Sequence, residues 1–365
     1  MARSEKNLTA VFTDTANAIR SKTGTTESIC PLDFADRIFD IDTAGPGGDS
    51  LKEYISDGGR FGGSQLRYFY KYDSYLRNVN DLEFAFTKSY LRAMPNIDFT
   101  NVSTFSRAFD GCESMSFDHV TSIVDGNPVF AKSKIVAKNM AGSCTRAFAN
   151  CTSLGYCDID ITSISKSTSC NTMFDGAYMR DIKFSTTDVY DFSYMFVNLR
   201  SSNGSTTDPY FTDLDNFSFN MNFTDPDYDS DLNLIGMFST SQFAHAPLFK
   251  IPDGSMIHKS IYMDYFFSYN EYLQVVPEYD LSKVVSLNGF VDGCYSLREF
   301  NARSISASLD LSQTTSMDRA ALINVLYNLI GTGGPTLTLT LGPDNLAKLT
   351  DEDKAIATNK GWTLA

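Results

Sequence analysis

The chain contains little tryptophan, histidine and cysteine, and it lacks any long apolar run. Its 365 residues include one Trp, three His and seven Cys. No apolar stretch approaches the roughly 18 residues that a membrane-spanning helix requires, so membrane insertion is not expected. The first residues show no apolar h-region of a secretory signal, which predicts synthesis in a cytoplasm where cysteines stay reduced.

Positive charge is also scarce. Lys and Arg number 30 against 44 Asp and Glu, which gives a formal net charge of −14. Nucleic-acid binding depends on cationic side chains that neutralise phosphates, and attraction to acidic membranes depends on the same side chains. The composition therefore predicts neither nucleic acid nor an acidic membrane among the partners.

Sequence patterns of catalytic sites are sparse. His119, His245 and His258 stand far apart, and neither a G-x-S-x-G elbow nor a Walker A pattern occurs. We therefore expect no enzyme activity and no cofactor. Glycosidic cleavage needs only two carboxyl groups roughly 5–10 Å apart, and an acidic surface offers such pairs by chance. A glycan-degrading enzyme thus stays an alternative without positive support.

One acidic cluster has the alternation of a calcium-binding loop. Carboxylates recur at every second position, at Asp225, Asp227, Asp229 and Asp231. The cluster lacks the Gly at the sixth position of an EF-hand loop and the bidentate Glu at the twelfth, where Gly236 stands. It is a weak match to a calcium site, and a solvated turn is the simpler interpretation.

What the chain has in abundance is phenylalanine, and much of it belongs to a recurring phrase. The clearest copies are Phe109-Asp-Gly-Cys112-Glu-Ser-Met115, Phe148-Ala-Asn-Cys151-Thr-Ser-Leu154 and Val291-Asp-Gly-Cys294-Tyr-Ser-Leu297. Weaker copies begin at Phe174, Phe196, Phe238 and Phe267. The seven copies are 22 to 42 residues apart, a spacing typical of solenoids, whose units bury their apolar faces by stacking on one another.

The phrase predicts the structure of each unit. We expect a helical turn before the Phe, a tight turn at Asp-Gly or Ala-Asn, and a short strand after the Leu or Met. Cys112, Cys151 and Cys294 share one position and should be small buried fillers in a column. The two long gaps, between Phe109 and Phe148 and between Phe196 and Phe238, should hold degenerate units or insertions.

The two ends of the chain differ from this repeat region, which we place at residues 66–315. Residues 1–43 predict two short helices that carry too little apolar surface to fold alone, so we expect this module to oligomerise or to dock on another protein. Its apolar stripes consist of Leu8, Phe12, Ile19, Phe34 and Ile38. Residues 44–65 are rich in glycine and predict a linker.

Residues 316–365 predict a regular α/β unit that caps the solenoid. Ser316 is expected to cap a helix that Gly331 ends, and residues 336–341 alternate as a strand does. Pro343 and Thr350 should each open a further helical segment.

Aromatic side chains give the candidate binding surface. Tyr262, Tyr265, Tyr269 and Tyr272 form a dense stretch with Phe266 and Phe267. Aromatic faces with polar rims suit sugar or protein recognition, although the position of Phe267 in the repeat predicts that it is core. The polar region 200–232, with Phe211 and Phe217, is expected to emerge as an insertion and to share this surface.

The phrase resembles the BspA-type leucine-rich repeat, a family of short strand-and-turn units with a Phe-x-x-Cys-x-Ser-Leu core. The tail, with Leu337-Thr-Leu-Thr-Leu-Gly, Asn345-Leu-Ala-Lys-Leu-Thr-Asp-Glu-Asp-Lys and Lys360-Gly-Trp-Thr-Leu, is similar to the ending of bacteriophage members of that family. The opening, Thr13-Asp-Thr-Ala-Asn-Ala-Ile-Arg20 followed by Pro31-Leu-Asp-Phe-Ala-Asp, is similar to a module at the start of phage tail and baseplate proteins.

The resemblance implies both a fold and a function. The fold class is α+β: an irregular leucine-rich-repeat-like solenoid of short strands and turns between a helical attachment module and an α/β cap. The function is that of a phage virion protein of the tail fibre or baseplate, exposed on the particle and adhering to a host-surface glycan or protein. The implied partners are other tail or baseplate proteins, and the implied assembly is a homotrimer. A connector without a receptor of its own is the alternative.

Overall fold

The computed structural model describes residues 79–125, 127–199, 216–224, 230–241, 243–252, 260–331 and 336–365, together with Asn17, Arg20, Arg67, Tyr68, Leu76, Leu214 and Gly333. The predicted linker 44–65 lies outside this part of the chain, and so does the predicted N-terminal module except for Asn17 and Arg20. The predicted residues that lie outside are Leu8, Phe12, Ile19, Phe34, Ile38, Phe211, Asp225, Asp227 and Asp229.

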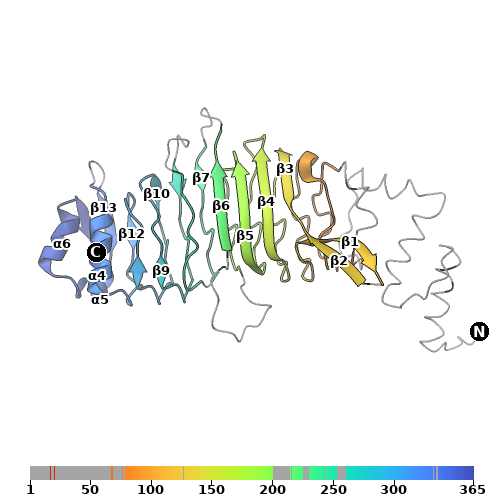
Figure 1. Cartoon of the computed structure of the whole chain (residues 1–365). Coiled ribbons are helices and arrows are strands. Elements are labelled where there is room, and N and C mark those ends of the chain that lie inside the picture. The colour runs from red at the N-terminus through yellow and green to blue at the C-terminus, as the bar shows by residue number, and fades with distance from the viewer. Residues whose placement is uncertain are drawn as a thin grey trace, which may run out of the picture.

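The described chain is mostly sheet and forms a β-solenoid of about eight turns, which extends from the hairpin end to a helical cap (Figure 1). The strands of successive turns pair in parallel and form short sheets along the axis. The largest sheet has the order β3(Ile135–Met140), β4(Gly155–Ser163), β5(Met179–Thr187) and β6(Asn216–Asn222). Its inward positions are apolar, as the buried Cys157, Ile159 and Ile161 on β4 illustrate.

Shorter strands continue the winding toward the C-terminal end. One sheet has the order β10(Val284–Ser286), β8(Ile261–Tyr262) and β7(Leu232–Asn233), and another pairs β11(Glu299–Phe300) with β9(Val275–Val276). A short 3-10 helix, η3(Phe99–Asn101), lies in an early turn. The predicted short strand after the Leu or Met of the phrase is confirmed at β4, β5 and β11, which begin within two residues of Leu154, Met179 and Leu297.

Each turn of the solenoid contains one six-residue turn segment. The eight segments are 83–88, 106–111, 145–150, 171–176, 193–198, 235–240, 264–269 and 288–293. Bonds from the amide of residue i+3 to the carbonyl of residue i close them, as in Ala108 to Phe105 and Cys112 to Phe109. The second and sixth residues of every segment have φ between 49° and 76°. The predicted helical turn before the Phe is therefore wrong, because a right-handed helix has no place for these left-handed residues.

The fourth residue of each segment points into the core and forms a column of stacked rings. The column consists of Phe86, Phe109, Phe148, Phe174, Phe196, Phe238 and Phe267, with Val291 at its C-terminal end. Neighbouring rings lie 5.3–5.9 Å apart between centroids and are within 18° of parallel. The predicted frame is confirmed, and Phe86 adds one copy that the sequence pattern did not indicate.

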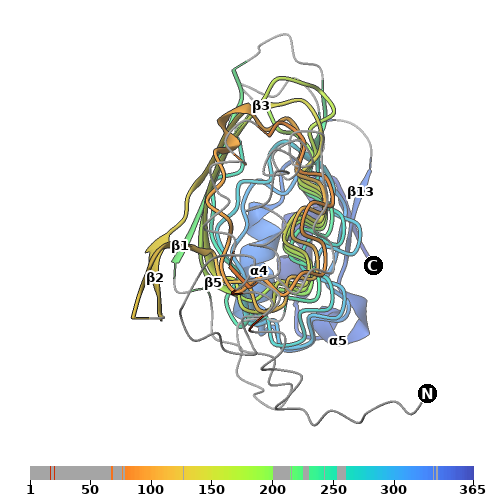
Figure 2. The same ribbon diagram turned by 90° about the vertical axis from the view of Figure 1, so that its right-hand side faces the viewer.

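Strand residues close the core from the other side. Phe184 on β5 meets Phe174 edge to face at 6.2 Å, and Phe219 on β6 meets Phe196 at 6.2 Å. Seen along the axis, the ribbons of successive turns nearly superimpose (Figure 2). The Phe column thus fixes the stacking of the turn segments while the strands fix the distance across the interior.

The predicted column of buried cysteines is also confirmed, and it has a second role. The thiols of Cys112, Cys151 and Cys294 each donate to the carbonyl of the column residue one turn earlier, at 3.1 Å. Ser241 and Asn270 make the same bond at this position. Burial raises the pKa of Cys112 to about 11 and that of Cys294 to about 12, so both stay protonated donors at neutral pH.

The gap between Phe109 and Phe148 contains an insertion, as predicted. Strands β1(Asp118–Val124) and β2(Asn127–Lys132) form an antiparallel hairpin that projects from the side of the solenoid (Figure 2). Tyr156 on β4 fastens its base, because its hydroxyl donates to Asp118 at 2.8 Å and accepts from the Ser133 amide at 2.9 Å.

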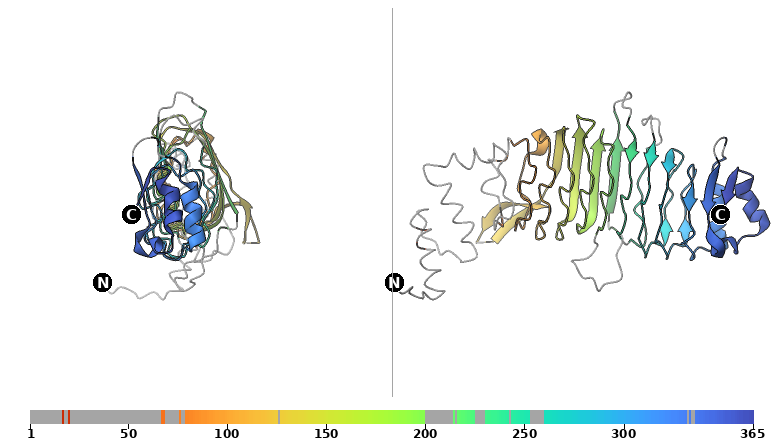
Figure 3. Two further views of the ribbon diagram at one scale, coloured as in Figure 1. Left: turned by 90° about the vertical axis from the view of Figure 1, so that its left-hand side faces the viewer. Right: turned by 180° about the vertical axis from the view of Figure 1, so that it is seen from behind.

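A compact unit closes the C-terminal end of the solenoid (Figure 3). It contains α4(Arg319–Asn328), β13(Leu337–Thr340), α5(Gly342–Leu346), α6(Asp351–Thr358) and β14(Trp362–Leu364). Strand β12(Leu309–Asp310) pairs with β13, so the cap continues the parallel ladder. The strand at 336–341 and the helices opened by Pro343 and Thr350 are confirmed. The expected Ser316 cap is wrong, because Asp318 caps α4 and accepts from the Ala321 amide.

Candidate binding surface on the turn segments

The outward side chains of the turn segments form one continuous surface, here called the corner face. It comprises the second, fifth and sixth residues of the eight segments together with the exposed residues that follow them. Four of the fifth residues lie beneath this surface and are buried, namely Asp110, Ala149, Ser239 and Ser268. The backbone beneath it is fixed by bonds between turns: Arg107 donates to Thr145, Phe109 to Ala147 and Gly111 to Ala149, at 2.8–2.9 Å. Because the backbone is held in this way, side chains at equivalent positions repeat along the axis like rungs.

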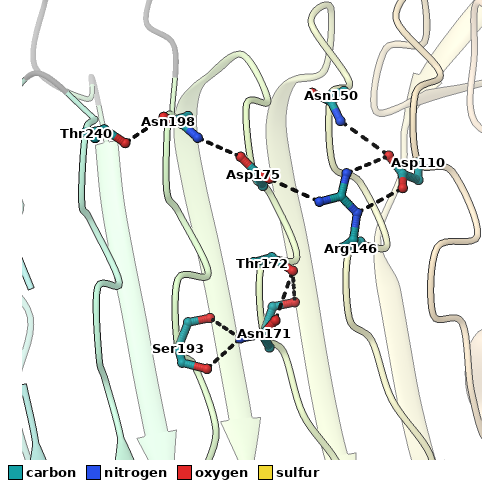
Figure 4. A network of polar contacts seen from close by, with 9 residues as sticks. All are labelled: Asp110, Arg146, Asn150, Asn171, Thr172, Asp175, Ser193, Asn198 and Thr240. Atoms are coloured by element: carbon teal, nitrogen blue, oxygen red, sulfur yellow. Dashed lines mark hydrogen bonds and ion pairs between the residues drawn. The ribbon is translucent and has the colours of Figure 1, made fainter. Parts of the chain in front are cut away.

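A ladder of polar contacts runs along the middle of the corner face (Figure 4). Arg146 is its centre and contacts Asp110 on the preceding turn at 3.0 Å and Asp175 on the following turn at 3.2 Å. Asn198 donates to Asp175 at 3.0 Å and accepts from Thr240 at 2.6 Å. The ladder therefore links five consecutive turns through their side chains.

Electrostatics hold the centre of this ladder in its charged form. The hydrogen bond that Arg146 donates to Asp110 raises the pKa of the guanidinium, although partial burial acts in the opposite direction. Asp110 is 8% exposed, and it also accepts from Asn150 at 3.4 Å. The polar side chains of the ladder thus bond to one another in the middle of the corner face.

The C-terminal part of the corner face is aromatic. Tyr265, Tyr269 and Tyr272, all predicted as binding residues, are 45%, 59% and 40% exposed. Tyr295 was not among the predicted residues, and its side chain is 56% exposed. The fourth predicted tyrosine, Tyr262, is only partly exposed on β8.

Two of these tyrosines are supported by glycines of the next turn. A Cβ added to Gly289 would lie 2.6 Å from the ring of Tyr265, and one added to Gly293 would lie 3.0 Å from Tyr269. Each ring therefore lies on backbone that carries no side chain, with part of its surface left open to solvent. The density of aromatic residues indicated this surface in the sequence, and the pairing of each ring with a glycine one turn later is a second signal that the sequence also contains.

The remaining predicted residues do not join the corner face. Phe217 is half-buried and packs on the rings of Phe238 and Phe249, so it lies apart from the tyrosines of the corner face. Asp231, the one described member of the acidic cluster, accepts from the amide of Ser260. His119 contacts the Ser133 hydroxyl at 3.1 Å through Nδ1. His245 forms an isolated bridge with Val275, while His258 lies outside the described residues.

The N-terminal part of the corner face is hollowed. A groove of about 730 Å³ lies across the first three turn segments, with Lys88, Tyr90, Arg107, Glu113 and Arg146 among its lining residues. The recurring phrase indicated neither the shape nor the residues of this groove. The copy in the first turn segment, which contains Phe86, lacks both the Asp-Gly turn and the Cys.

Within the ranges given above, no three His, Cys, Asp or Glu side chains gather as a metal-binding group. Across the same ranges, no helix combines the length and the apolar character that crossing a bilayer requires.

Comparison of the chain with family models, with curated proteins and with solved structures finds no match.

Proposed function

We propose that this chain is a phage virion protein of the tail fibre or baseplate that adheres to the host surface through the tyrosines of its corner face. The observation that carries this proposal is the set formed by Tyr265, Tyr269, Tyr272 and Tyr295, which are 40–59% exposed on stacked turns. Tyrosine offers a large amphipathic contact at a low cost in conformational entropy. The recurring phrase and the two chain ends support the virion assignment by their resemblance to phage proteins.

The finer assignments belong to the same proposal. The solenoid units are leucine-rich-repeat-like in the BspA manner, because they repeat the Phe-x-x-Cys-x-Ser-Leu core. Residues 1–43 attach the rod to other tail or baseplate proteins and assemble it as a homotrimer. In this arrangement the repeat domain faces the host cell.

Adhesion is tested with full-length protein on bacterial cells. The labelled chain is expected to bind cells of a susceptible strain and to compete with phage adsorption. The double variant Tyr265→Ala/Tyr269→Ala should lose at least about tenfold in apparent affinity, which corresponds to 1.4 kcal/mol. The matched control is Tyr327→Ala, since Tyr327 is 65% exposed on helix α4 of the cap.

Three outcomes would contradict the proposal in different ways. Failure of the parent chain to bind or compete would favour a connector without a receptor. Equal binding by the double variant and the control would remove the tyrosines from the contact surface. Release of soluble glycan fragments from the cells would favour the enzyme.

The connector is a second candidate because of one observation on the hairpin. Ile123, Val124, Val129 and Phe130 are 38–55% exposed on β1 and β2. A two-stranded hairpin is marginally stable in isolation, and exposed apolar side chains on it suit contact with another protein. Loss of particle assembly, but not of cell binding, on changing Val124 and Phe130 to Ser would support a connecting role for the hairpin.

A further inference from the structure

We propose that the groove at the N-terminal end of the corner face binds an acidic saccharide, with Lys88 and Arg107 pairing with its carboxylate and Tyr90 stacking on its ring. The groove is lined by the first three turn segments and lies four to six turn spacings from Tyr265. With about 4.8 Å between paired strands, the two sites are roughly 20–30 Å apart. The groove is therefore a different site from the tyrosines, and its ligand does not depend on the virion assignment.

The side chains that line the groove carry a net positive charge. Three cations line the groove, namely Lys88, Arg107 and Arg146, against two carboxylates, Asp110 and Glu113. The whole chain has the opposite balance, with a net charge of −14. Charges farther away than about 8–10 Å are largely screened at physiological ionic strength, so the local cations determine what the groove attracts.

Two of the three cations are available to a ligand. Within the described part of the chain, the ion pairs in this groove all involve Arg146, through Asp110 and Asp175. Lys88 and Arg107 are exposed. The guanidinium of Arg107 lies over the ring of Phe84, 5.5 Å from its centroid, which orients it without neutralising it.

The backbone holds these two cations in a fixed position. Lys88 and Arg107 have φ of 56° and 52°, the left-handed conformation that non-glycine residues rarely adopt. The Phe column and the hydrogen bonds between turns fix this conformation. Lys88 lies directly over Gly111, where an added Cβ would be 3.0 Å from the Lys88 side chain. The two cations are thus held on neighbouring turns of a rigid stack.

The uncharged and acidic side chains of the groove favour a saccharide over other anions. Tyr90 is 57% exposed and supplies an aromatic surface for a sugar ring. Glu113 and Asn150, also in the lining, suit hydroxyl groups as acceptor and donor. Nucleic acid carries densely spaced phosphates, which would meet Glu113 and Asp110 unfavourably. A sugar with one carboxylate per ring and several hydroxyls matches the whole set.

The test measures binding of the purified full-length chain to a hexasaccharide of galacturonic acid, with maltohexaose as the neutral counterpart, by titration calorimetry. The parent chain should bind the acidic ligand at least about tenfold more tightly than the neutral one. The variant Lys88→Asn/Arg107→Asn should lose at least tenfold for the acidic ligand alone. Asparagine tolerates left-handed φ better than most residues, so this variant keeps the backbone. Arg107→Lys should retain most of the affinity.

A matched control removes the same two charges elsewhere. Lys283→Asn/Arg298→Asn changes two exposed residues outside the groove, and it should bind the acidic ligand as the parent does. Absence of binding by the parent, equal binding of the neutral ligand, or an equal loss in the control variant would overturn the inference. Tighter binding of a single-stranded oligonucleotide would overturn it in favour of nucleic acid. Loss of cell adhesion in the tyrosine variants has no bearing on these outcomes, so the two proposals fail separately.

Discussion

The inner and outer sides of the turn segments share one backbone and differ completely in their side chains. Inside, the fourth residue is Phe in seven of the eight segments, and its ring stacks on the next. Outside, the second residue changes from Phe84 through Arg107 and Arg146 to Tyr265. The backbone conformation is nevertheless the same, with a left-handed residue at this position in all eight segments.

This difference shows how the fold separates stability from recognition. The inner residue is set by its two neighbours in the column, so any change affects three turns at once. The outer residue is constrained by its φ, which the inner packing already enforces, and by its contacts with the outer residues of neighbouring turns. The corner face can therefore carry a cationic groove, a polar ladder and a tyrosine cluster on one unchanged scaffold.

Removing one ring from the inner column should have the largest effect. In Phe148→Ala, the rings of Phe109 and Phe174, now 5.3 Å and 5.6 Å from Phe148, would lose the ring between them. We expect a loss of about 3–5 kcal/mol in the free energy of unfolding, because a buried Phe leaves a cavity that the stack cannot close. Urea denaturation followed by circular dichroism measures it. A loss below about 1 kcal/mol would mean that the column does not determine the stacking.

Breaking the polar ladder on the corner face should lower the free energy of unfolding by a smaller amount. Arg146→Asn leaves Asp110, which is 8% exposed, without its cationic partner. A fully buried pair would cost 3–5 kcal/mol, and partial solvent exposure of Arg146 reduces this to about 1–3 kcal/mol. The asparagine keeps the left-handed φ of 55° at this position.

A double variant separates the charge effect from lost packing. In Arg146→Asn/Asp110→Asn, the unpaired carboxylate is also removed, so much of the lost stability should return. If the double variant is as unstable as Arg146→Asn, the packing of the arginine side chain matters more than its charge. Thermal unfolding of the three proteins in one buffer makes the comparison.

The inner side could largely be predicted from the sequence, and the outer side largely could not. The column was visible because every turn requires a large apolar residue at a fixed distance from a small one, as in Phe148 and Cys151. Phe86 was missed although its phrase has the same form as the recognised copy at Phe238, with Ser89 where Ser241 stands. Ser241 donates to a column carbonyl as the cysteines do, so the position accepts either small donor.

The outer side depends on contacts between turns that spacing alone does not reveal. Arginine and tyrosine rarely adopt left-handed φ, so a local interpretation favoured a helical turn and misplaced the side chains. The contact of Arg146 with Asp110 and Asp175 bridges 36 and 29 residues of sequence. Only the register of the stacked turns brings such residues together, and that register becomes known once all eight segments are aligned.

The smallest effect on stability is expected at Asp292, a carboxylate on the corner face that has no cationic partner in the polar ladder. Asp292 occupies the fifth position of its segment, where Asp110 and Asp175 contact Arg146. Burial raises the pKa of Asp292, and the nearby charge of Asp310 adds to this shift. A carboxyl group with a raised pKa in the folded state favours folding while protonated, and this contribution disappears as pH rises from its unfolded value of about 3.9 through the folded value.

Asp292→Asn should therefore stabilise the protein slightly at neutral pH, by about 0.5 kcal/mol or less because the group is partly exposed. The gain should shrink as pH falls toward 4, where the carboxyl group of the parent becomes protonated. Thermal unfolding of parent and variant between pH 4 and pH 7 measures the difference. A constant difference over this range would assign the effect to the amide's hydrogen bonds and not to the charge. A loss of stability at neutral pH would mean that the Asp292 carboxylate has a favourable partner, as its two counterparts do, and the contrast between paired and unpaired outer positions would then fail.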